Sequence, residues 1–199
     1  MKISLKHISK KFQGHWIFKD INYVFEAPAK VSILGPNGSG KSTLLRIIAG
    51  MQSSSYGEVI FDNSTLNIQH SALSYCAPGM DIPEELTLLE FFQFHFALKE
   101  MLPGMSIESI LRLTGLYEAR HKAIDTFSSG MKQRVKLAQA IFSNTTLLLL
   151  DEPCTNLDEA GMQQYADWID NYTNGRLIIV ASNNIKEYYF CQDSISLEL

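Results

Sequence analysis

The chain has 199 residues, of which 46% are hydrophobic and 19% are charged, a balance typical of a folded globular domain. Its net charge of −4 argues against a nucleic-acid-binding protein, because such proteins usually carry a strongly basic face. The sequence has no uninterrupted run of about 18 apolar residues, so it predicts no membrane span. The cysteines and histidines lack the spacing of a disulfide framework or a metal site.

Short runs that alternate apolar and polar side chains occur near the N-terminus, over residues 1–30. This alternation predicts antiparallel strands with one solvated face. A second strand-like region follows at residues 57–76. We therefore expect these two regions to form a small antiparallel β part.

The stretch Gly-Pro-Asn-Gly-Ser-Gly-Lys-Ser-Thr at residues 35–43 is the most informative in the chain. It lies between an apolar run at 31–34 and a helical pattern at 44–49, which is the order of strand, glycine-rich loop and helix in a phosphate-binding loop. Its glycines allow several N–H groups to point at one anion, and the helix dipole adds to their attraction. The residues expected to bind the nucleotide phosphates are Gly35, Asn37, Gly38, Ser39, Gly40, Lys41, Ser42 and Thr43. Lys41 would bring a positive charge to the outer phosphates, and Ser42 a hydroxyl to Mg²⁺.

Residues 84–126 have helical patterns and are expected to form a helical insert. Thr87 and Glu90 match a capping box before a helix at 88–101, and Pro-Gly at 103–104 separates it from a second helix at 106–116. In the first helix, positions 91, 94 and 98 share one face and positions 92, 96 and 99 share another, and each face carries two phenylalanines. Either both faces are buried within the chain or one of them meets a partner.

Two continuous apolar runs, at 147–150 and 177–181, are typical of central strands in a parallel sheet. Polar residues follow both runs, and the carboxyl ends of parallel strands meet at one edge of the sheet, where ligands bind. Asp151 is therefore expected to hold Mg²⁺ together with Ser42. Glu152 is placed to orient or deprotonate the attacking water, although an acidic turn would have the same sequence.

Residues 127–134, Phe-Ser-Ser-Gly-Met-Lys-Gln-Arg, resemble the signature motif of ABC ATPases. Asp-Glu-Pro at 151–153 resembles the end of their Walker B motif, and Thr-Asn-Leu-Asp at 155–158 resembles their D-loop. The resemblance covers nearly the whole chain and implies one ABC ATPase domain over residues 1–199. The resemblance further implies that this domain is α/β, with a RecA-like P-loop NTPase core, a small antiparallel β-subdomain and a helical subdomain, and that its ligands are ATP and Mg²⁺.

The resemblance also implies a head-to-tail homodimer. In such a dimer, Ser128, Ser129 and Gly130 of one subunit would contact the γ-phosphate held by the other subunit, although Ser128 could be only a helix cap. Phe12 stands where the family has an aromatic residue that stacks on adenine. Trp16 is a rival for that role, and burial in the small sheet is the alternative for Phe12.

Three positions depart from the family pattern. Pro78 stands where the Q-loop glutamine is expected, Asn183 where the switch histidine is expected, and Ser129 where the first signature glycine is expected. Proline cannot ligate Mg²⁺ through its side chain, and asparagine can donate a hydrogen bond to phosphate but cannot carry a charge or a proton. We expect secure ATP binding and slow hydrolysis, with Glu152, Lys41 and Asn183 as the catalytic residues.

The function implied by the resemblance is that of the ATP-binding and hydrolysing subunit of an ABC transporter. Its expected partners are a second copy of the chain and a separate transmembrane permease, with no nucleic acid, at the cytoplasmic face of the cell membrane. The short chain also resembles compact exporter-type ATPases. A soluble ABC-type ATPase outside transport and an ATP sensor with little turnover are the alternatives, and the transported substrate and its direction stay open.

Overall fold

A computed structural model describes residues 1–62 and 72–197, which divide into two compact units. Unit 1 comprises Met1–Tyr75, Thr146–Glu152 and Gly175–Leu199, and unit 2 comprises Cys76–Thr145 and Pro153–Asn174. The chain therefore passes between the units four times. One of these crossings lies between Glu152 and Pro153, directly after the acidic pair predicted to serve the site.

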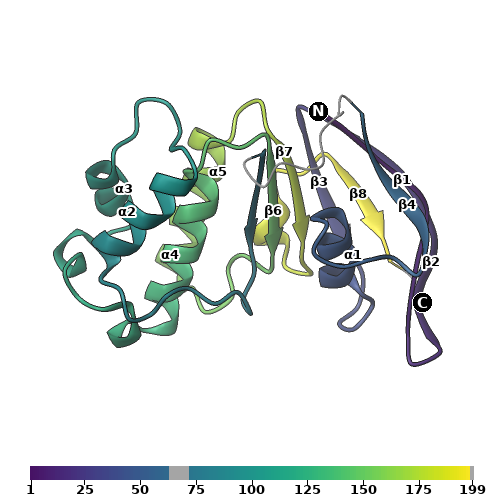
Figure 1. The fold of residues 1–199 in the computed structure, drawn as a ribbon, viewed down its shortest axis with the longest axis horizontal. Helices are drawn as coiled ribbons and strands as arrows, with labels where there is room; N and C mark the ends of the chain where they lie inside the picture. The colour runs from purple at the N-terminus through teal and green to yellow at the C-terminus, as the bar shows by residue number, and fades with distance from the viewer. Residues whose placement is uncertain (63–71, 198–199) are drawn as a thin grey trace. The chain divides into compact units, whose positions relative to one another are not determined.

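The described residues of unit 1 form β-strands in two sheets and short helices (Figure 1). Its elements are β1 (Lys2–Phe12), β2 (His15–Glu26), β3 (Ala29–Leu34), α1 (Lys41–Ile48), β4 (Tyr56–Asp62), β5 (Leu73–Cys76, whose last residue belongs to unit 2), β6 (Leu147–Asp151), β7 (Leu177–Ala181), α6 (Ile185–Tyr188) and β8 (Asp193–Ser196). The smaller sheet has the order β2-β1-β4 and is antiparallel. The larger sheet has the order β5-β6-β7-β3-β8, and its pairs β6–β7, β7–β3 and β3–β8 are parallel.

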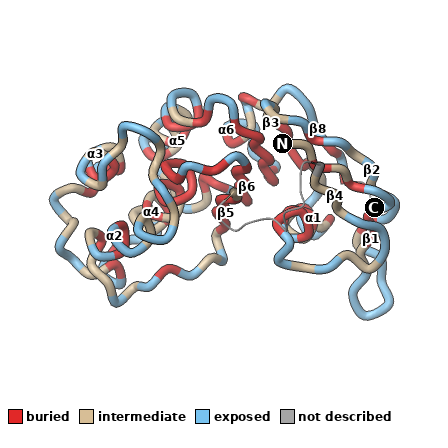
Figure 2. Tube along the Cα trace, turned by 45° about the horizontal axis from the view of Figure 1, so that its top comes forward, coloured by how far each residue is buried: buried red, intermediate tan, exposed pale blue. Residues whose placement is uncertain are grey.

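The core of unit 1 explains why the apolar runs became central strands. Every residue of β6 and β7 is buried, as predicted for strands covered on both faces, and Figure 2 shows buried backbone at β6. Helix α1 buries Leu44, Leu45 and Ile48 in one core that also contains Ile3 of β1 and Ile33 of β3. Because each such side chain contributes roughly 1.5–3 kcal/mol when fully buried, this core fixes the loop that joins β3 to α1.

The predicted antiparallel β part is correct for β1, β2 and β4 but wrong for residues 73–76. These residues form β5, which pairs with β6 in the larger sheet. Leu73, Ser74 and Cys76 are all buried, as suits a strand inside the larger sheet. The part of the prediction that covers residues 63–71 lies outside the described residues.

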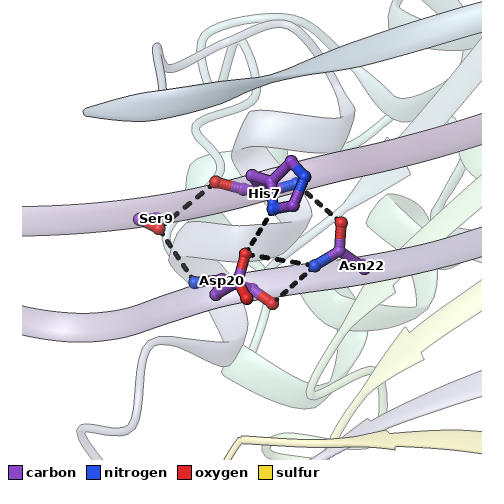
Figure 3. A network of polar contacts seen from close by, with 4 residues as sticks. All are labelled: His7, Ser9, Asp20 and Asn22. Atoms are coloured by element: carbon purple, nitrogen blue, oxygen red, sulfur yellow. Dashed lines mark hydrogen bonds and ion pairs between the residues drawn. The ribbon is translucent and has the colours of Figure 1, made fainter.

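The β1–β2 pairing is interrupted where four side chains replace regular ladder contacts (Figure 3). His7 and Asp20 have positive φ angles of 53° and 56°, and their side chains meet at 2.6 Å between Nδ1 and Oδ1. The backbone N–H of His7 donates to Oδ1 of Asn22 at 2.9 Å, and that of Asp20 donates to Oγ of Ser9 at 2.8 Å. The hydrogen bond with His7 lowers the pKa of Asp20, but both side chains are exposed, so this ion pair adds little to stability.

Unit 2 is mostly helical, in agreement with the helical pattern predicted for residues 84–126. Its elements are α2 (Leu88–Leu98), α3 (Ile107–Leu113), the 3₁₀ turns η2 (Tyr117–Ala119) and η3 (Ile124–Thr126), α4 (Ser129–Ile141) and α5 (Glu159–Tyr172). No helix in the described part of the chain is long and apolar enough to cross a membrane.

The start of α2 follows the predicted capping box. The N–H of Glu90 donates to Oγ1 of Thr87 at 3.3 Å, and the N–H of Thr87 donates to Oε2 of Glu90 at 2.8 Å. The helix ends earlier than predicted, at Leu98, because Lys99 is extended and Met101 forms a β-bridge with Ser143. Helix α3 likewise ends at Leu113, earlier than the predicted residue 116.

The apolar side chains of α2 are not all covered. Phe91 and Phe92 are buried, whereas Phe94 is 55% exposed and Leu98 is 73% exposed. The face that contains positions 91, 94 and 98 is therefore buried only at its beginning. That this face meets a partner stays a prediction.

His95 gives unit 2 a pH-dependent stability that can be measured. Its Nε2 lies 3.0 Å from Oγ of Ser143, and burial, with a smaller effect of the positive Lys99, lowers its pKa from 6.5 to about 4. Between these values the unfolded chain binds a proton that the folded chain does not, so stability is lost as the pH falls. We expect this residue to lower the free energy of unfolding by about 2 kcal/mol between pH 7 and pH 5.

Urea unfolding of the wild type and of His95→Gln at both pH values measures this effect, because the contributions of other titrating groups cancel in the comparison. The variant should lose less stability than the wild type on acidification. Equal losses in the two proteins would contradict the lowered pKa.

Candidate functional site

The loop between β3 and α1 has a backbone that only glycine suits at two positions. Gly35 has a φ of 147° and Gly40 a φ of 96°. A Cβ atom on Gly40 would lie 2.4 Å from Cγ2 of Ile17, and one on Gly35 would lie 2.6 Å from the carbonyl oxygen of Leu197. The hydroxyl of Ser39 is buried in this loop and has no hydrogen-bond partner among the described residues. The loop thus begins a helix with its first N–H groups free to face an anion.

Lys41 is held over this loop although its side chain is only 6% exposed. Its Nζ donates to the carbonyl oxygens of Gly35 at 2.8 Å and of Pro36 at 3.2 Å. These bonds satisfy part of the ammonium group and keep it at the start of α1. A phosphate bound by the loop would meet a positive charge that is already positioned.

Ser42 and Asp151 bring two oxygen atoms together at the edge of the larger sheet. The hydroxyl of Ser42 donates to Oδ1 of Asp151 at 2.9 Å. Burial raises the pKa of Asp151, which is 3% exposed, while the hydrogen bond from Ser42 lowers it. Hydroxyl and carboxylate oxygens beside a phosphate loop are ligands that suit Mg²⁺, which binds proteins through one or two carboxylates and substrate phosphates. The residues present therefore fit the ion.

A pocket opens above the loop and includes Glu152. Its lining residues are Ile17, Asn37, Gly38, Gly40, Lys41, Ser42, Thr43 and Glu152. Glu152 is exposed and has a φ of 43°, an uncommon conformation for a residue other than glycine. Glu152 thus lines the same pocket as the phosphate loop, and its role as a base stays a prediction.

Asn183 contacts the same loop from the end of β7. Its Nδ2 donates to Oδ1 of Asn37 at 2.9 Å, across 146 positions of sequence. The predicted neighbourhood of Asn183 and the phosphate loop is therefore present. The side-chain pair itself has no signature in the local sequence.

The aromatic residues near the β1–β2 turn are exposed, at 48% for Phe12 and 36% for Trp16. Nζ of Lys10 lies 5.0 Å from the ring centre of Phe12, and Trp16 lies near Tyr56 and two lysines. The alternative that Phe12 is a buried core residue is wrong, but its stacking on adenine stays a prediction. Ile17 lines the pocket and was missed, because nothing in its sequence context separates it from other strand residues.

The predicted signature residues lie in unit 2, at the start of α4. Ser128 caps this helix, since its Oγ accepts a hydrogen bond from the N–H of Met131 at 3.2 Å. A Cβ atom on Gly130 would lie 2.9 Å from the carbonyl oxygen of Asn156, so glycine allows α4 to approach the D-loop-like segment closely. The cap does not test contact of Ser128, Ser129 or Gly130 with a nucleotide on a partner subunit, which stays a prediction.

Pro78, at the position of the expected glutamine, also contacts α4. Nζ of Lys136 donates to the carbonyl oxygen of Pro78 at 2.9 Å. Pro78 can therefore offer only its backbone carbonyl oxygen as a ligand, and that oxygen already accepts a hydrogen bond from Lys136.

The fold, together with the phosphate loop between β3 and α1, defines a P-loop nucleotide-binding domain. The family model for ABC transporters matches residues 18–155. The chain therefore belongs to the ABC transporter family, and its relatives include many ATP-binding proteins of such transporters.

Three of these relatives indicate the range of the resemblance. The cytochrome c biogenesis ATP-binding export protein CcmA of Reclinomonas americana is 32% identical over 183 residues, which cover 87% of this chain and 82% of that protein. The uncharacterised ABC transporter ATP-binding proteins YhcH and YdbJ of Bacillus subtilis are 28% and 30% identical over 98% and 93% of this chain. The chain spans only 66% and 62% of their respective lengths.

Solved structures confirm the predicted α/β fold as that of ABC ATPase cassettes. The ATP-binding cassette MJ0796, solved as a dimer in a post-hydrolysis state with ADP and Pi, has a TM-score of 0.84 and 25% identity. The match covers 98% of this chain and 94% of that one. An ATP-binding protein from Pyrococcus furiosus has a TM-score of 0.82 over 99% of this chain and, at 20% identity, supports the fold alone.

Proposed function

We propose that the chain binds and hydrolyses ATP and drives a membrane transporter by closing a dimer when ATP is bound. The observation that carries this proposal is the pocket in which Lys41, Ser42 and Glu152 meet. These side chains supply a positive charge, a hydroxyl and a carboxylate at one phosphate loop. Phosphoryl transfer needs little else, since its catalysis is mostly positioning and electrostatic stabilisation.

In the proposed reaction, the phosphate loop binds ATP and Lys41 neutralises charge on its outer phosphates. Ser42 and Asp151 would hold Mg²⁺, which would supply further positive charge to offset that of the phosphates. Water attacks the γ-phosphorus while Glu152 orients it and accepts its proton. The bond from the γ-phosphorus to the bridging oxygen breaks, and ADP and phosphate are released.

The proposed partners are a second copy of the chain and a transmembrane permease at the cytoplasmic face of the membrane. The homodimer is supported by the dimeric cassettes among the similar structures. In it, Ser128, Ser129 and Gly130 of one subunit would complete the γ-phosphate site of the other. The relatives include ATP-binding proteins named for export and for import, so both directions of transport fit the proposal.

Two measurements test this function. The purified chain should hydrolyse MgATP, and a tagged chain in its native cells should co-purify with a polytopic membrane protein from detergent extracts. Turnover without any membrane partner would favour a soluble ABC-type ATPase. Absence of both turnover and ATP binding would refute the proposal.

Pro78 and Asn183 favour a second candidate, an ATP sensor with little turnover. Pro78 cannot ligate Mg²⁺ through its side chain as a glutamine could, and Asn183 cannot carry the charge or the proton of a histidine. This candidate is distinguished by tight ATP binding together with turnover too slow to support transport.

We expect the substitution Asn183→His to raise the basal ATPase rate several-fold. A histidine there can carry positive charge beside the γ-phosphate and stabilise the transition state. Steady-state rates at saturating MgATP measure the effect, with Asn171→His, at an exposed position of α5, as the control. A marked fall in rate at unchanged ATP affinity would instead show that the contact between Asn183 and Asn37 has a role of its own.

A further inference from the structure

Gln133 is a polar side chain buried in the middle of unit 2. It lies on α4 and is only 2% exposed. Its Nε2 donates to the carbonyl oxygen of Pro153 at 2.7 Å and lies 4.0 Å from Sγ of Cys76. Pro153 and Cys76 are the first residues of unit 2 after two of the chain crossings. The amide group of Gln133 therefore contacts the first residue of unit 2 after each of these two crossings.

The link from Glu152 to Pro153 is consequently anchored at both ends. The N–H of Glu152 donates to the carbonyl oxygen of Ala181 in unit 1 at 2.9 Å, and the carbonyl of Pro153 accepts from Gln133 in unit 2. Between these bonds, Glu152 has its φ of 43°. Such a conformation is unfavourable for a residue other than glycine and persists only where its surroundings impose it.

Helix α4 also holds the segment that follows Cys76. Lys136 bonds to the carbonyl of Pro78, and Nε2 of Gln139 lies 3.8 Å from Sδ of Met80. Three positions of α4 thus contact the segment in sequence order: 133 contacts 76, 136 contacts 78 and 139 contacts 80. Of these three side chains, only Gln133 also reaches the residue after Glu152.

We propose that Gln133 is a positioning residue for Glu152, which it acts on through the Pro153 carbonyl. This inference rests on the proposed ATPase function. Loss of the amide donor would release one end of the strained link and let the Glu152 carboxylate leave its place beside the phosphate loop. ATP binding would be unaffected, because the phosphate loop is anchored by β3 and α1.

The first test compares Gln133→Met with Gln139→Met. Both glutamines are buried on α4, and methionine keeps the length of the side chain while removing the N–H donor. We expect Gln133→Met to lower kcat about tenfold or more at an unchanged KM for MgATP, since small misplacements of a catalytic group cost this much. Gln139→Met should keep kcat within about twofold. Equal effects of the two substitutions would overturn the proposal.

A third variant, Gln133→Glu, tests the donor itself. A buried carboxyl group has a raised pKa, and it can donate to the Pro153 carbonyl only when it is protonated. The ratio of its kcat to that of the wild type should therefore rise as the pH falls from about 8 to 6. The ratio for Gln133→Met should stay flat. A flat ratio for both variants would refute a role for the hydrogen bond.

Amide hydrogen exchange separates failure of this inference from failure of the proposed function. In nucleotide-free protein, the N–H of Glu152 should exchange faster in Gln133→Met than in the wild type or Gln139→Met. If the wild type proved to lack turnover, the ATPase proposal would fail, yet this exchange would still decide whether Gln133 anchors the link. Unchanged exchange at Glu152 would overturn the inference.

Discussion

Glu152→Gln should reduce ATP turnover by on the order of 10²–10⁴-fold, because it removes the base while keeping the shape of the side chain. ATP should then persist at the site instead of being hydrolysed. If closure of a dimer requires intact ATP, the variant should remain dimeric in ATP, whereas the wild type returns to monomers as it consumes the nucleotide. Light scattering should show about twice the monomer mass for the variant.

The matched control is Glu26→Gln, which makes the same chemical change at an exposed position of β2 in the same unit. It should keep wild-type turnover and return to monomers. A Glu152→Gln protein with wild-type turnover would contradict the role of Glu152 as the base. A protein that is inactive yet monomeric at high concentration with ATP would count against closure by ATP alone.

Lys41→Ala should weaken ATP binding on the order of 10²-fold, because truncating one member of a buried, hydrogen-bonded charge pair costs about 2–5 kcal/mol. The variant loses the ammonium group that now bonds to Gly35 and Pro36 and is positioned for the outer phosphates. Turnover should fall with it. Calorimetric titration with MgATP measures the affinity directly.

Lys41→Met is a second variant that keeps most of the buried aliphatic chain and removes the charged, hydrogen-bonding ammonium group. Lys6→Ala, at an exposed position of β1, controls for the loss of a lysine from unit 1. Thermal melting should show that all three variants fold. Unchanged affinity and unchanged turnover in Lys41→Ala would refute the assignment of the phosphate site.

Local patterns predicted much of this fold because the responsible interactions are themselves local. The strand, glycine-rich loop and helix around Gly40 follow from turn chemistry, and the start of α2 follows from the box formed by Thr87 and Glu90. The prediction placed β5 in the wrong sheet, because its membership of the larger sheet depends on pairing with β6, more than 70 positions away. A four-residue strand does not reveal in its own sequence which partner will cover it.

The same limit applies to the site. The contact of Ser42 with Asp151 was predictable because each residue carries a motif of its own. The bond from Asn183 to Asn37 and the bond from Gln133 to Pro153 were not, because a hydrogen bond between distant side chains leaves no periodic pattern. The left-handed backbone of Glu152 could not be predicted either, since nothing about glutamate favours that conformation.

The position of β3 in the larger sheet has a consequence for the order in which the protein is made. β3 carries the phosphate loop at its end, yet its two neighbours are β7 and β8, which are the last strands of the described chain. A ribosome has therefore synthesised the loop long before either neighbouring strand leaves the exit tunnel. Non-local pairing of this kind is slow to form. The phosphate loop thus gains its neighbouring strands only after β7 and β8 have been synthesised, so a shorter nascent chain cannot yet hold the loop as the complete sheet does.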